Sequence, residues 1–160
     1  MAQRIFLKIG DIKGESTDKN HKDEIDVQSW TWGLTQQVIH AIGGETALGR
    51  AKFDELQFTH KVDLASTALM LACAGGRHLK DARLTARKGG NKPLEYLVIT
   101  LKDVLITSVR DAGDAAATGT HETATLIFSS IDVMYTPQTA SGAGGTPVHF
   151  KWDVQANKPG

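Results

Sequence analysis

The sequence contains little of what several classes of protein need. One cysteine among 160 residues, Cys73, excludes an internal disulfide, so folding needs no oxidising compartment. Eighteen Lys and Arg balance eighteen Asp and Glu, and a net charge of zero removes the basic surface expected of a protein that follows nucleic acid or an anionic membrane. Aromatic residues make up only 6%, whereas glycine occurs 16 times, which favours a protein of strands and turns.

Long apolar runs are also missing. No segment approaches the about 20 consecutive apolar residues that a membrane helix needs. At the N-terminus only about four apolar residues follow Arg4 before Lys8, which is too few for the core of a signal peptide. We therefore expect a protein that is made and folded in the cytoplasm and that leaves the cell, if it does, without the classical export signal.

The length of 160 residues predicts a single domain spanning residues 1–160. A globular chain of 17.2 kDa leaves roughly 7,800 Å² accessible to solvent and buries the rest in a core. Such a core needs no disulfide or metal to hold it together.

Alternation of apolar and polar residues predicts strands over much of the chain. The pattern is clear in residues 5–9, in Asp54–Val62 and in Val148–Val154, where every second side chain is apolar. It is weaker in Arg83–Lys88, which the turn Gly89–Pro93 connects to the next strand as a hairpin.

Two longer segments, Leu94–Val109 and Glu122–Pro137, are apolar over 16 residues each. Strands usually run about 5–6 residues, so strands of this length are expected to bend and serve two sheets or the wall of a barrel. The first is apolar on both faces and needs a helix or another subunit to cover it. In the second the apolar parity changes near Ser129–Ser130, which predicts a bulge or bend there. A similar change occurs within Glu24–Gly33.

One helix is expected over residues Leu64–Ala74, with the Asp63 carboxylate capping its first turn and Gly75–Gly76 ending it. It is apolar nearly all round, which predicts a packed element with little exposed surface. Three segments rich in Gly, Ala and Thr are expected to be loops: Ala41–Ala51, Asp111–Thr120 and Gln138–Thr146. The fold class is therefore mainly antiparallel β with a single flanking helix.

Catalytic and metal-binding patterns are absent from the sequence. The six histidines are scattered singly and are expected at the surface or at strand edges, and Cys73 is expected to be a small buried hydrophobe. No glycine-rich stretch matches a phosphate loop or a dinucleotide fingerprint, and no nucleophile elbow is present. Lysines and acids interleave between Lys8 and Glu24, which predicts a solvated loop. We expect no enzyme, no metal and no cofactor.

Five segments of the chain together resemble one known family. They are FLKIGDIKGES (6–16), EIDVQSWTWG (24–33), LQFTHKVDLAST (56–67), LMLACAGGRH (69–78) and EYLVITLKDVLITSV (95–109). In this order they resemble the haemolysin-coregulated protein (Hcp) family of type VI secretion systems, and the similarity runs from about Ala2 to Asp153.

The resemblance implies an antiparallel β-barrel of two sheets flanked by a helix. It implies that six copies form a ring with a wide central channel, that rings stack into a tube, and that small effector proteins are held in the lumen. A contractile sheath would drive this tube, with a spike at its tip, into a neighbouring cell, so the protein would be exported without a signal peptide. Since the sequence ends at Gly160, shortly after the last expected strand, no C-terminal effector extension is expected.

Two pairs of residues in the segment around Gly33 are candidates for specific roles. Ser29 and Thr31 alternate with Trp30 and Trp32, so the two pairs face opposite sides of the strand. The hydroxyl pair is expected either to face the channel and contact effectors or to lie on an ordinary strand surface. The tryptophans are expected either to pack in the core or to anchor a contact between subunits.

The alternative function is a stand-alone small β-barrel that binds a sugar or single-stranded nucleic acid on an exposed sheet. It would need aromatic side chains exposed on one face within basic surroundings. The zero net charge does not favour the nucleic-acid version.

Overall fold

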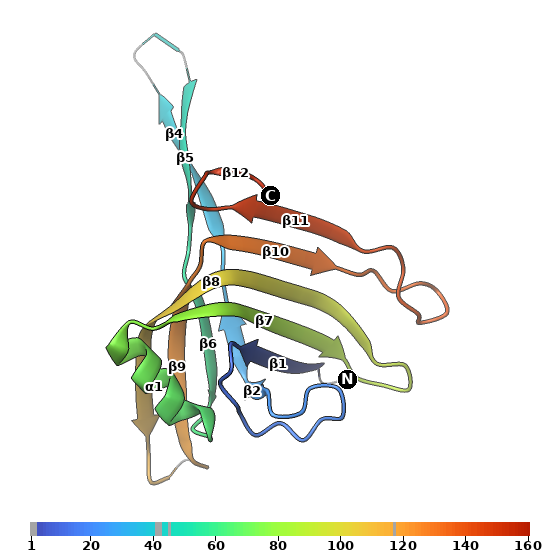
Figure 1. Cartoon of the computed structure of the whole chain (residues 1–160). Helices are drawn as coiled ribbons and strands as arrows, with labels where there is room; N and C mark the ends of the chain where they lie inside the picture. The colour runs from blue at the N-terminus through green and yellow to red at the C-terminus, as the bar shows by residue number, and fades with distance from the viewer. Residues whose placement is uncertain (1–2, 41–42, 45, 117) are drawn as a thin grey trace.

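The computed structural model describes residues 3–40, 43–44, 46–116 and 118–160, and within them the chain is almost entirely antiparallel β with one helix (Figure 1). The helix is α1 (Ala65–Gly75). The strands are β1 (Gln3–Ile9), β2 (Ile25–Val27), β3 (Ser29–Thr31), β4 (Leu34–His40), β5 (Thr46–Phe53), β6 (Leu56–Lys61), β7 (His78–Lys88), β8 (Leu94–Gly113), β9 (Thr120–Ile127), β10 (Ser130–Tyr135), β11 (Val148–Asp153) and β12 (Lys158–Pro159).

The strands form two sheets that share β8. The first sheet has the order β12-β11-β10-β8-β7-β1-β2, and the second continues from β8 through β9 and β6 to β3. The first half of β8 pairs with β7 and β10, whereas its second half pairs with β9. The segment of residues 25–31 also serves both sheets, because β2 pairs with β1 and β3 pairs with β6. The predicted class, mainly antiparallel β with a flanking helix, is confirmed.

The two sheets part where β8 and the following strands bend. Asp103 adopts a positive φ of 51°, which is uncommon outside glycine, and the Ser129 hydroxyl donates to its carboxylate at 2.8 Å. Residues 128–129 are not in a strand and separate β9 from β10. The predicted bend near Ser129–Ser130 is therefore confirmed, and β8 is the predicted long strand that serves two sheets.

The core fills the space between the sheets and below the helix. Alternate residues of each strand contribute to it, as the sequence pattern predicts, among them Ile5, Leu7, Leu84, Ile99 and Phe58. On the opposite face of β8, Val98 is buried beside its cross-strand neighbours on β7 and β10, whereas Tyr96 and Thr100 are half-buried and Lys102 is exposed. The helix contacts β8 from the core side, so it does not cover this second face.

Helix α1 starts and ends close to the predicted residues. The Asp63 carboxylate accepts the N–H of Ala65 at 2.8 Å, and Gly76 ends the helix with a positive φ of 61°. The prediction that the helix is packed all round is wrong. Leu69 and Ala72 are buried against the core, whereas Leu71 on the opposite side is 75% exposed.

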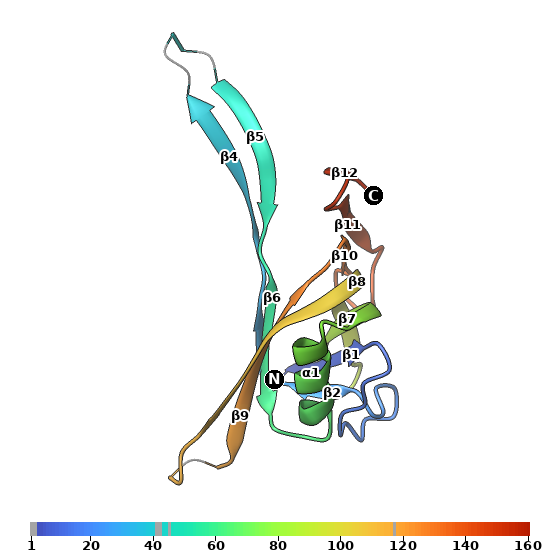
Figure 2. The ribbon, with the colours of Figure 1, turned by 60° about the vertical axis from the view of Figure 1, so that its left-hand side comes forward.

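Strands β4 and β5 form a two-stranded arm that projects from the body of the molecule (Figures 1 and 2). All residues of β4 are exposed. The arm corrects the prediction of a loop at Ala41–Ala51, because residues 46–51 are part of β5, while residues 41, 42 and 45 lie outside the described residues. Only the base of the arm meets the core, through Phe53, so most of the arm lacks the apolar alternation that would reveal a strand.

The other two predicted loops have different outcomes. Within Asp111–Thr120, β8 continues to Gly113 and β9 begins at Thr120, so the loop prediction is wrong at both ends of this segment. Residues 138–146 form the predicted irregular loop, closed by a single bridge between Gln138 and Gly144.

Candidate functional site

The exposed side of the second sheet carries an unusual number of hydroxyl groups. Ser29 and Thr31 lie on β3 with their side chains away from the core, because the residue paired with Trp30 between them is the buried Phe58. The pairing of β3, β6 and β9 places further hydroxyl side chains beside them. We call this surface the hydroxyl face, formed by Ser29, Thr31, Thr59, Thr107, Thr123 and Thr125.

The hydroxyls of this face bond to one another across the strands. Ser29 and Thr59 share a hydrogen bond, and the Thr107 and Thr125 hydroxyls lie 2.7 Å apart. These hydroxyl side chains are uncharged and can offer hydrogen bonds to a ligand, and Arg110, which pairs with Thr123, adds a positive charge beside them. Beside Thr31 it ends in a depression of about 380 Å³, which Lys52 and Asp54 at the base of the arm also line.

The two tryptophans lie on the other side of the same segment. Trp30 and Trp32 are half-buried and pack against the core. The Trp32 ring lies 6.2 Å from the ring of Phe53 and 6.4 Å from that of Phe128. The alternative of core packing describes their position in one chain, and an additional contact with a second subunit stays a prediction.

This placement does not favour a nucleic-acid or sugar platform. Such a surface needs aromatic rings exposed on one face, on which bases or sugar rings can stack. Here the side of the second sheet that faces away from the core presents hydroxyls, while Trp30 and Trp32 point to the core.

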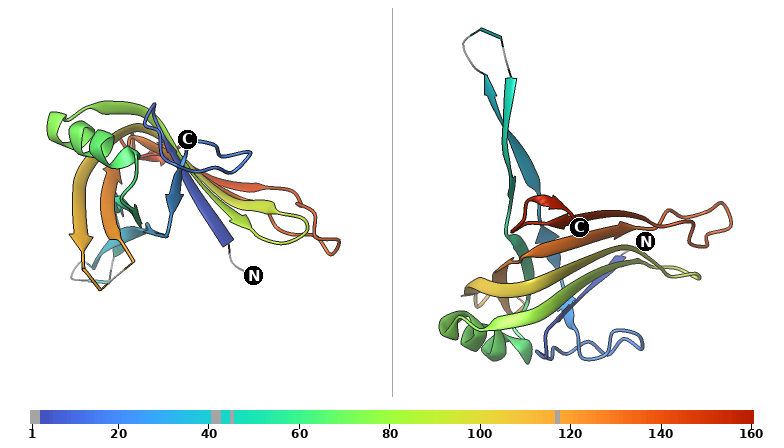
Figure 3. Two further views of the ribbon diagram at one scale, coloured as in Figure 1. Left: turned by 90° about the horizontal axis from the view of Figure 1, so that it is seen from below. Right: turned by 45° about the horizontal axis from the view of Figure 1, so that its top comes forward.

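Part of the first sheet is apolar and uncovered. Strands β8, β10 and β11 extend beyond the second sheet, away from α1 (Figure 3). At that end Tyr135 is 44% and Val148 is 60% exposed, on the same side of the sheet as the core residue Ile99. We call this surface the shelf: Tyr135 and Val148 are its exposed residues, and the half-buried Leu97, Val133 and Phe150 connect them to the core.

The arm presents a second apolar surface. Four of its large hydrophobic side chains are between 46% and 70% exposed: Leu34, Val38, Ile39 and Leu48. Val38 and Leu48 pair on one face of the arm, whereas Ile39 lies on the other, so both faces expose large apolar side chains, which on a soluble protein favours a site of interaction. The shelf and the arm are different in shape and sequence, so the chain carries two unlike apolar surfaces.

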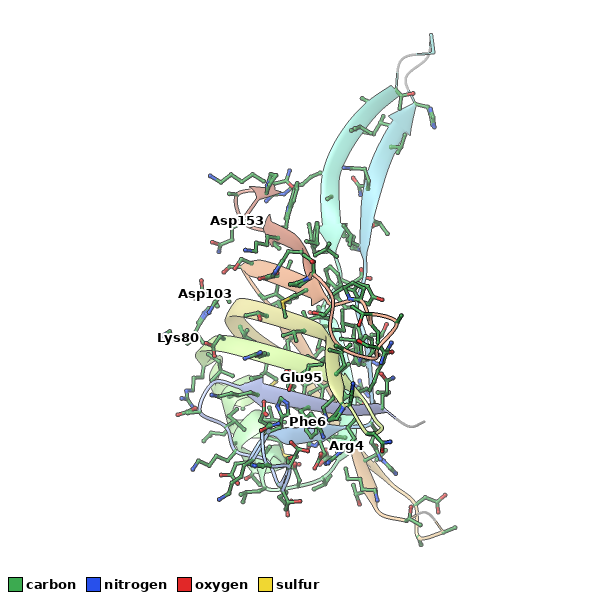
Figure 4. The ribbon with its side chains drawn as sticks, turned by 90° about the vertical axis from the view of Figure 1, so that its right-hand side faces the viewer. Arg4, Phe6, Lys80, Glu95, Asp103 and Asp153 are labelled. Atoms are coloured by element: carbon green, nitrogen blue, oxygen red, sulfur yellow. The ribbon has the colours of Figure 1, made fainter. Side chains whose placement is uncertain are left out.

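The segment of residues 10–24, predicted to be a solvated loop, is instead fastened to the first sheet. The buried His21 ring stacks on Phe6 with 4.3 Å between ring centroids. Its Nδ1 contacts Glu24, and its Nε2 lies 2.6 Å from a carboxylate oxygen of Glu95. Figure 4 labels Phe6 and Glu95 among the side chains of this region.

A second fastening of the same segment uses Asp18. Its carboxylate binds the Arg87 guanidinium at 2.6 Å and that of Arg4 at 3.2 Å. The hydrogen bond from Arg87 holds the pKa of Asp18 well below its usual range. Sequence reasoning missed both fastenings because the partners lie far along the chain, 69 residues away for Arg87 and 74 for Glu95.

A buried ionisable pair lies at the end of the second sheet near the helix. His60 and Glu122 are both completely buried, with 2.8 Å between Nε2 and Oε1. Burial lowers the pKa of His60, but hydrogen bonds and charges of Asp63 and Glu122 outweigh it and raise the pKa above its ordinary value. Burial also raises the pKa of Glu122, with Asp111 acting in the same direction and His60 against it.

The prediction of surface histidines is thus wrong for His21 and His60. The other four are exposed or half-buried: His40, His78, His121 and His149. Cys73 is half-buried and packs against the core.

Among the described residues, no group of three or more His, Cys, Asp or Glu side chains could hold a metal ion. In the same part of the chain, α1 is too short to cross a membrane, and no helix there is both long and apolar enough to do so.

Comparison with known proteins agrees with the resemblance seen in the sequence. Residues 6–135 match the family model described as "Type VI secretion system effector, Hcp". The protein hcp1 of Pseudomonas aeruginosa is 44% identical over 159 residues, which cover 98% of each chain. The crystal structure of Hcp1 from Salmonella typhimurium is 36% identical, covers 99% of each chain and has a TM-score of 0.80.

A solved type six secretion system protein has a TM-score of 0.92 at 24% identity, covering 99% of this chain and all of the other, and shows that the fold is shared. The names of these relatives describe secretion proteins, and none of them names a catalytic activity. The identity over the full length and the family match lead to one conclusion: this chain belongs to the Hcp family of type VI secretion system proteins.

Proposed function

We propose that this protein is a tube subunit of a type VI secretion system. Six copies join into a ring, rings stack into a tube, and small effector proteins are held in the lumen against the hydroxyl face. The observation that carries the proposal is the pair of unlike apolar surfaces, the shelf and the arm, that a single chain leaves uncovered.

Two unlike surfaces on one chain suit a ring. When one surface of a subunit meets a different surface of the next, the arrangement repeats head to tail and closes if the rotation allows. An isolated two-stranded hairpin is at best marginally stable in water, so the arm gains stability when it packs on a neighbour. Trp32 lies just before β4, with its ring 6.2 Å from that of Phe53 on β5, so it is placed at the base of the arm to take part in such a contact.

The exposed area of the chain supports the same proposal. The chain exposes 9690 Å², against roughly 7,800 Å² for a compact globular chain of this mass. The excess of about 1,900 Å² is close to two half-interfaces of about 800 Å² each, the amount that one subunit loses to its two neighbours in a ring.

The hydroxyl face is the proposed lumen surface. Ser29 and Thr31 are exposed and uncharged, and they offer hydrogen bonds that are weak enough to release a cargo protein after delivery. The proposed external partners are the sheath that drives the tube and the spike at its tip. Export would follow from this transport, after folding in the cytoplasm and without a signal peptide.

Electron microscopy of the negatively stained protein tests the assembly. We expect rings with a central hole and short stacks of rings. Particles of uniform small size without a hole, at the same protein concentration, would contradict the proposal.

A substitution on the hydroxyl face tests the lumen. Thr31→Arg should leave the rings intact but abolish retention of the small proteins that co-purify with the wild-type ring, because a long charged side chain fills the contact surface. Lys151→Glu, on the first sheet, is the control and should retain them. Equal retention by the Thr31 variant would show that effectors do not contact this face.

A further inference from the structure

The arm leaves the body through a cluster of aromatic rings, which we call the root cluster: Trp32, Phe53, Phe150 and Trp152. Trp32 precedes β4, Phe53 ends β5, and the other two belong to β11. Ring centroids lie 6.2 Å apart for Trp32 and Phe53, 6.2 Å for Phe53 and Trp152, and 6.3 Å for Phe150 and Trp152. Both strands of the arm are thus tied at one point to the C-terminal part of the chain.

A second contact ties the arm farther out. The Arg50 side chain on β5 donates through Nη2 to the backbone carbonyl of Val154 at 2.9 Å and to that of Gln155 at 2.8 Å. A guanidinium that donates to two carbonyl groups forms charge-assisted hydrogen bonds, which are stronger than bonds between neutral groups. Both acceptors belong to the turn that connects β11 with β12.

The turn that accepts these bonds is itself well defined. The N–H of Ala156 donates to the Asp153 carboxylate at 2.9 Å, and Asn157 adopts a positive φ of 54°. Strand β12 then returns along β11, with Trp152 opposite Pro159 and Asp153 opposite Lys158. Figure 4 labels Asp153 at the end of β11. The carbonyls of the turn are therefore held in place to receive the Arg50 side chain.

Two contacts at separate points along the arm fix its direction relative to the body, whereas a contact at one point lets it rotate about that point. Within the described residues β4 and β5 pair with each other and with no other strand. Arg50 lies three residues from Phe53, which at a strand rise of about 3.3 Å per residue places it about 10 Å along the arm. At its base the arm is held by the root cluster, by its chain connections to β3 and β6, and by the hydrogen bond from the Asp54 N–H to the Gly33 carbonyl at 3.0 Å. All of these lie close together, so the Arg50 contact farther out is the one that limits the swing of the arm.

We propose that the C-terminal turn, residues 154–157, is a brace that holds the arm in one direction through Arg50. Arg50 is a positioning residue, since it acts through the arm and not by touching another subunit. The consequence for assembly rests on the proposed function: a braced arm meets its neighbour without first losing orientational freedom, so the brace lowers the concentration at which rings form.

Spin labels on the arm and on the body measure the brace directly. The labels are placed at Thr46→Cys and Lys80→Cys in a chain carrying Cys73→Ser, and labelled chain is diluted with unlabelled chain so that distances within one chain are read. We expect a narrow distance distribution for the parent, a broad one for Arg50→Ala, and a narrow one for Lys52→Ala, which removes another cation from the same strand.

A change on the other side of the contact tests the turn. Asp153→Ala removes the carboxylate that accepts the Ala156 N–H and shapes the turn, so it should also broaden the distance distribution. In the double variant Arg50→Ala/Asp153→Ala the distribution should be no broader than in Arg50→Ala alone. An unchanged narrow distribution in Arg50→Ala overturns the brace. Broadening by Lys52→Ala to the same extent also overturns it, because the effect would then not belong to the Arg50 contact.

The molecular mass of the same proteins in solution distinguishes a failure of the proposed brace from a failure of the proposed ring. The protein concentration at which half of the chains are assembled should be about tenfold higher for Arg50→Ala than for the parent. If the parent does not assemble at all while Arg50→Ala broadens the distribution, the proposed function fails and the brace stands. If the distribution broadens and assembly stays unchanged, the link from the brace to assembly is refuted.

Discussion

Gly14 shows how one residue determines the path of the segment over the first sheet. A Cβ atom at this position would lie 2.6 Å from the backbone oxygen of Glu24 and 2.8 Å from the Cα of Ile25, closer than packed atoms approach. Backbone atoms cannot move aside as the end of a side chain can. We therefore expect Gly14→Ala to lower the free energy of unfolding by about 1–3 kcal/mol, measured by urea denaturation.

Gly75→Ala is the matched control for this substitution. Gly75 is the last residue of α1, and among the described residues no atom from outside its own helix and its chain neighbours lies within 4 Å of where a Cβ atom would sit. Alanine there should leave the unfolding free energy unchanged or raise it by at most about 1 kcal/mol. Equal destabilisation by both substitutions would show that the close approach at Gly14 is not what fixes the segment.

The buried pair His60 and Glu122 should make stability depend on pH. Both pKa values are raised in the folded protein above their ordinary values of 6.5 and 4.5. The folded state therefore holds protons that the unfolded chain has already lost, so the stability that the pair contributes falls as the pH rises through the folded-state pKa values. For His60 this contribution is fully present below pH 6.5.

Urea denaturation of the wild type and of the double variant His60→Gln/Glu122→Gln measures this effect. The wild-type free energy of unfolding, minus that of the double variant, should fall as the pH rises above the ordinary pKa values of 4.5 for Glu122 and 6.5 for His60, by at most about 1.4 kcal/mol per pH unit for each proton. The double variant keeps all other titrating groups, so their contributions cancel. A difference that rises with pH, or stays constant, would refute the raised pKa values.

At the residue scale, some of this could be predicted from sequence and some could not. The alternation of Ser29 and Thr31 with Trp30 and Trp32 predicts opposite faces, because side chains alternate along any strand. The burial of His60 could not be predicted, since Glu122 is 62 residues away and only the pairing of β6 with β9 brings the two together.

At the scale of single elements, α1 has one buried and one exposed side although nearly all its residues are apolar. Leu69 is fully buried and Leu71 is 75% exposed. Replacing Leu69 with alanine should lower the free energy of unfolding by about 2–5 kcal/mol, because it leaves a cavity in the core. Leu71→Ala should change it by less than about 0.5 kcal/mol. Chemical denaturation of the two variants compares them, and equal effects would show that the helix packs differently.

The elements that the sequence predicts well are those with one face on the core. Strands β1, β6 and β11 alternate clearly, and α1 has both a capping residue and a glycine at its end. The arm could not be predicted, because all of β4 is exposed and only the second half of β5, up to Phe53, has a half-buried side. Its bulge, where the register shifts between Gln36 and Val38 opposite Gly49, breaks the pattern further.

At the scale of the whole molecule, we expect neighbouring subunits to cover the shelf and the arm, so a change on the shelf should prevent assembly. Val148 on the shelf is already 60% exposed, so Val148→Asp should leave the chain folded. If a neighbouring subunit covers the shelf, the buried carboxylate costs several kcal/mol and prevents assembly. Light scattering after gel filtration should therefore find single chains for Val148→Asp.

The control for the shelf is Lys151→Asp, on the opposite side of the same strand β11. This variant should assemble as the wild type does. If Val148→Asp assembles equally well, the shelf is not an interface between subunits.

The mass of the wild-type protein in solution tests the central claim most directly. Native mass spectrometry should find a species of about 103 kDa, six times the chain mass of 17.2 kDa, because the two unlike apolar surfaces cover each other around a closed ring. A single species of 17.2 kDa that persists at high protein concentration would contradict the account.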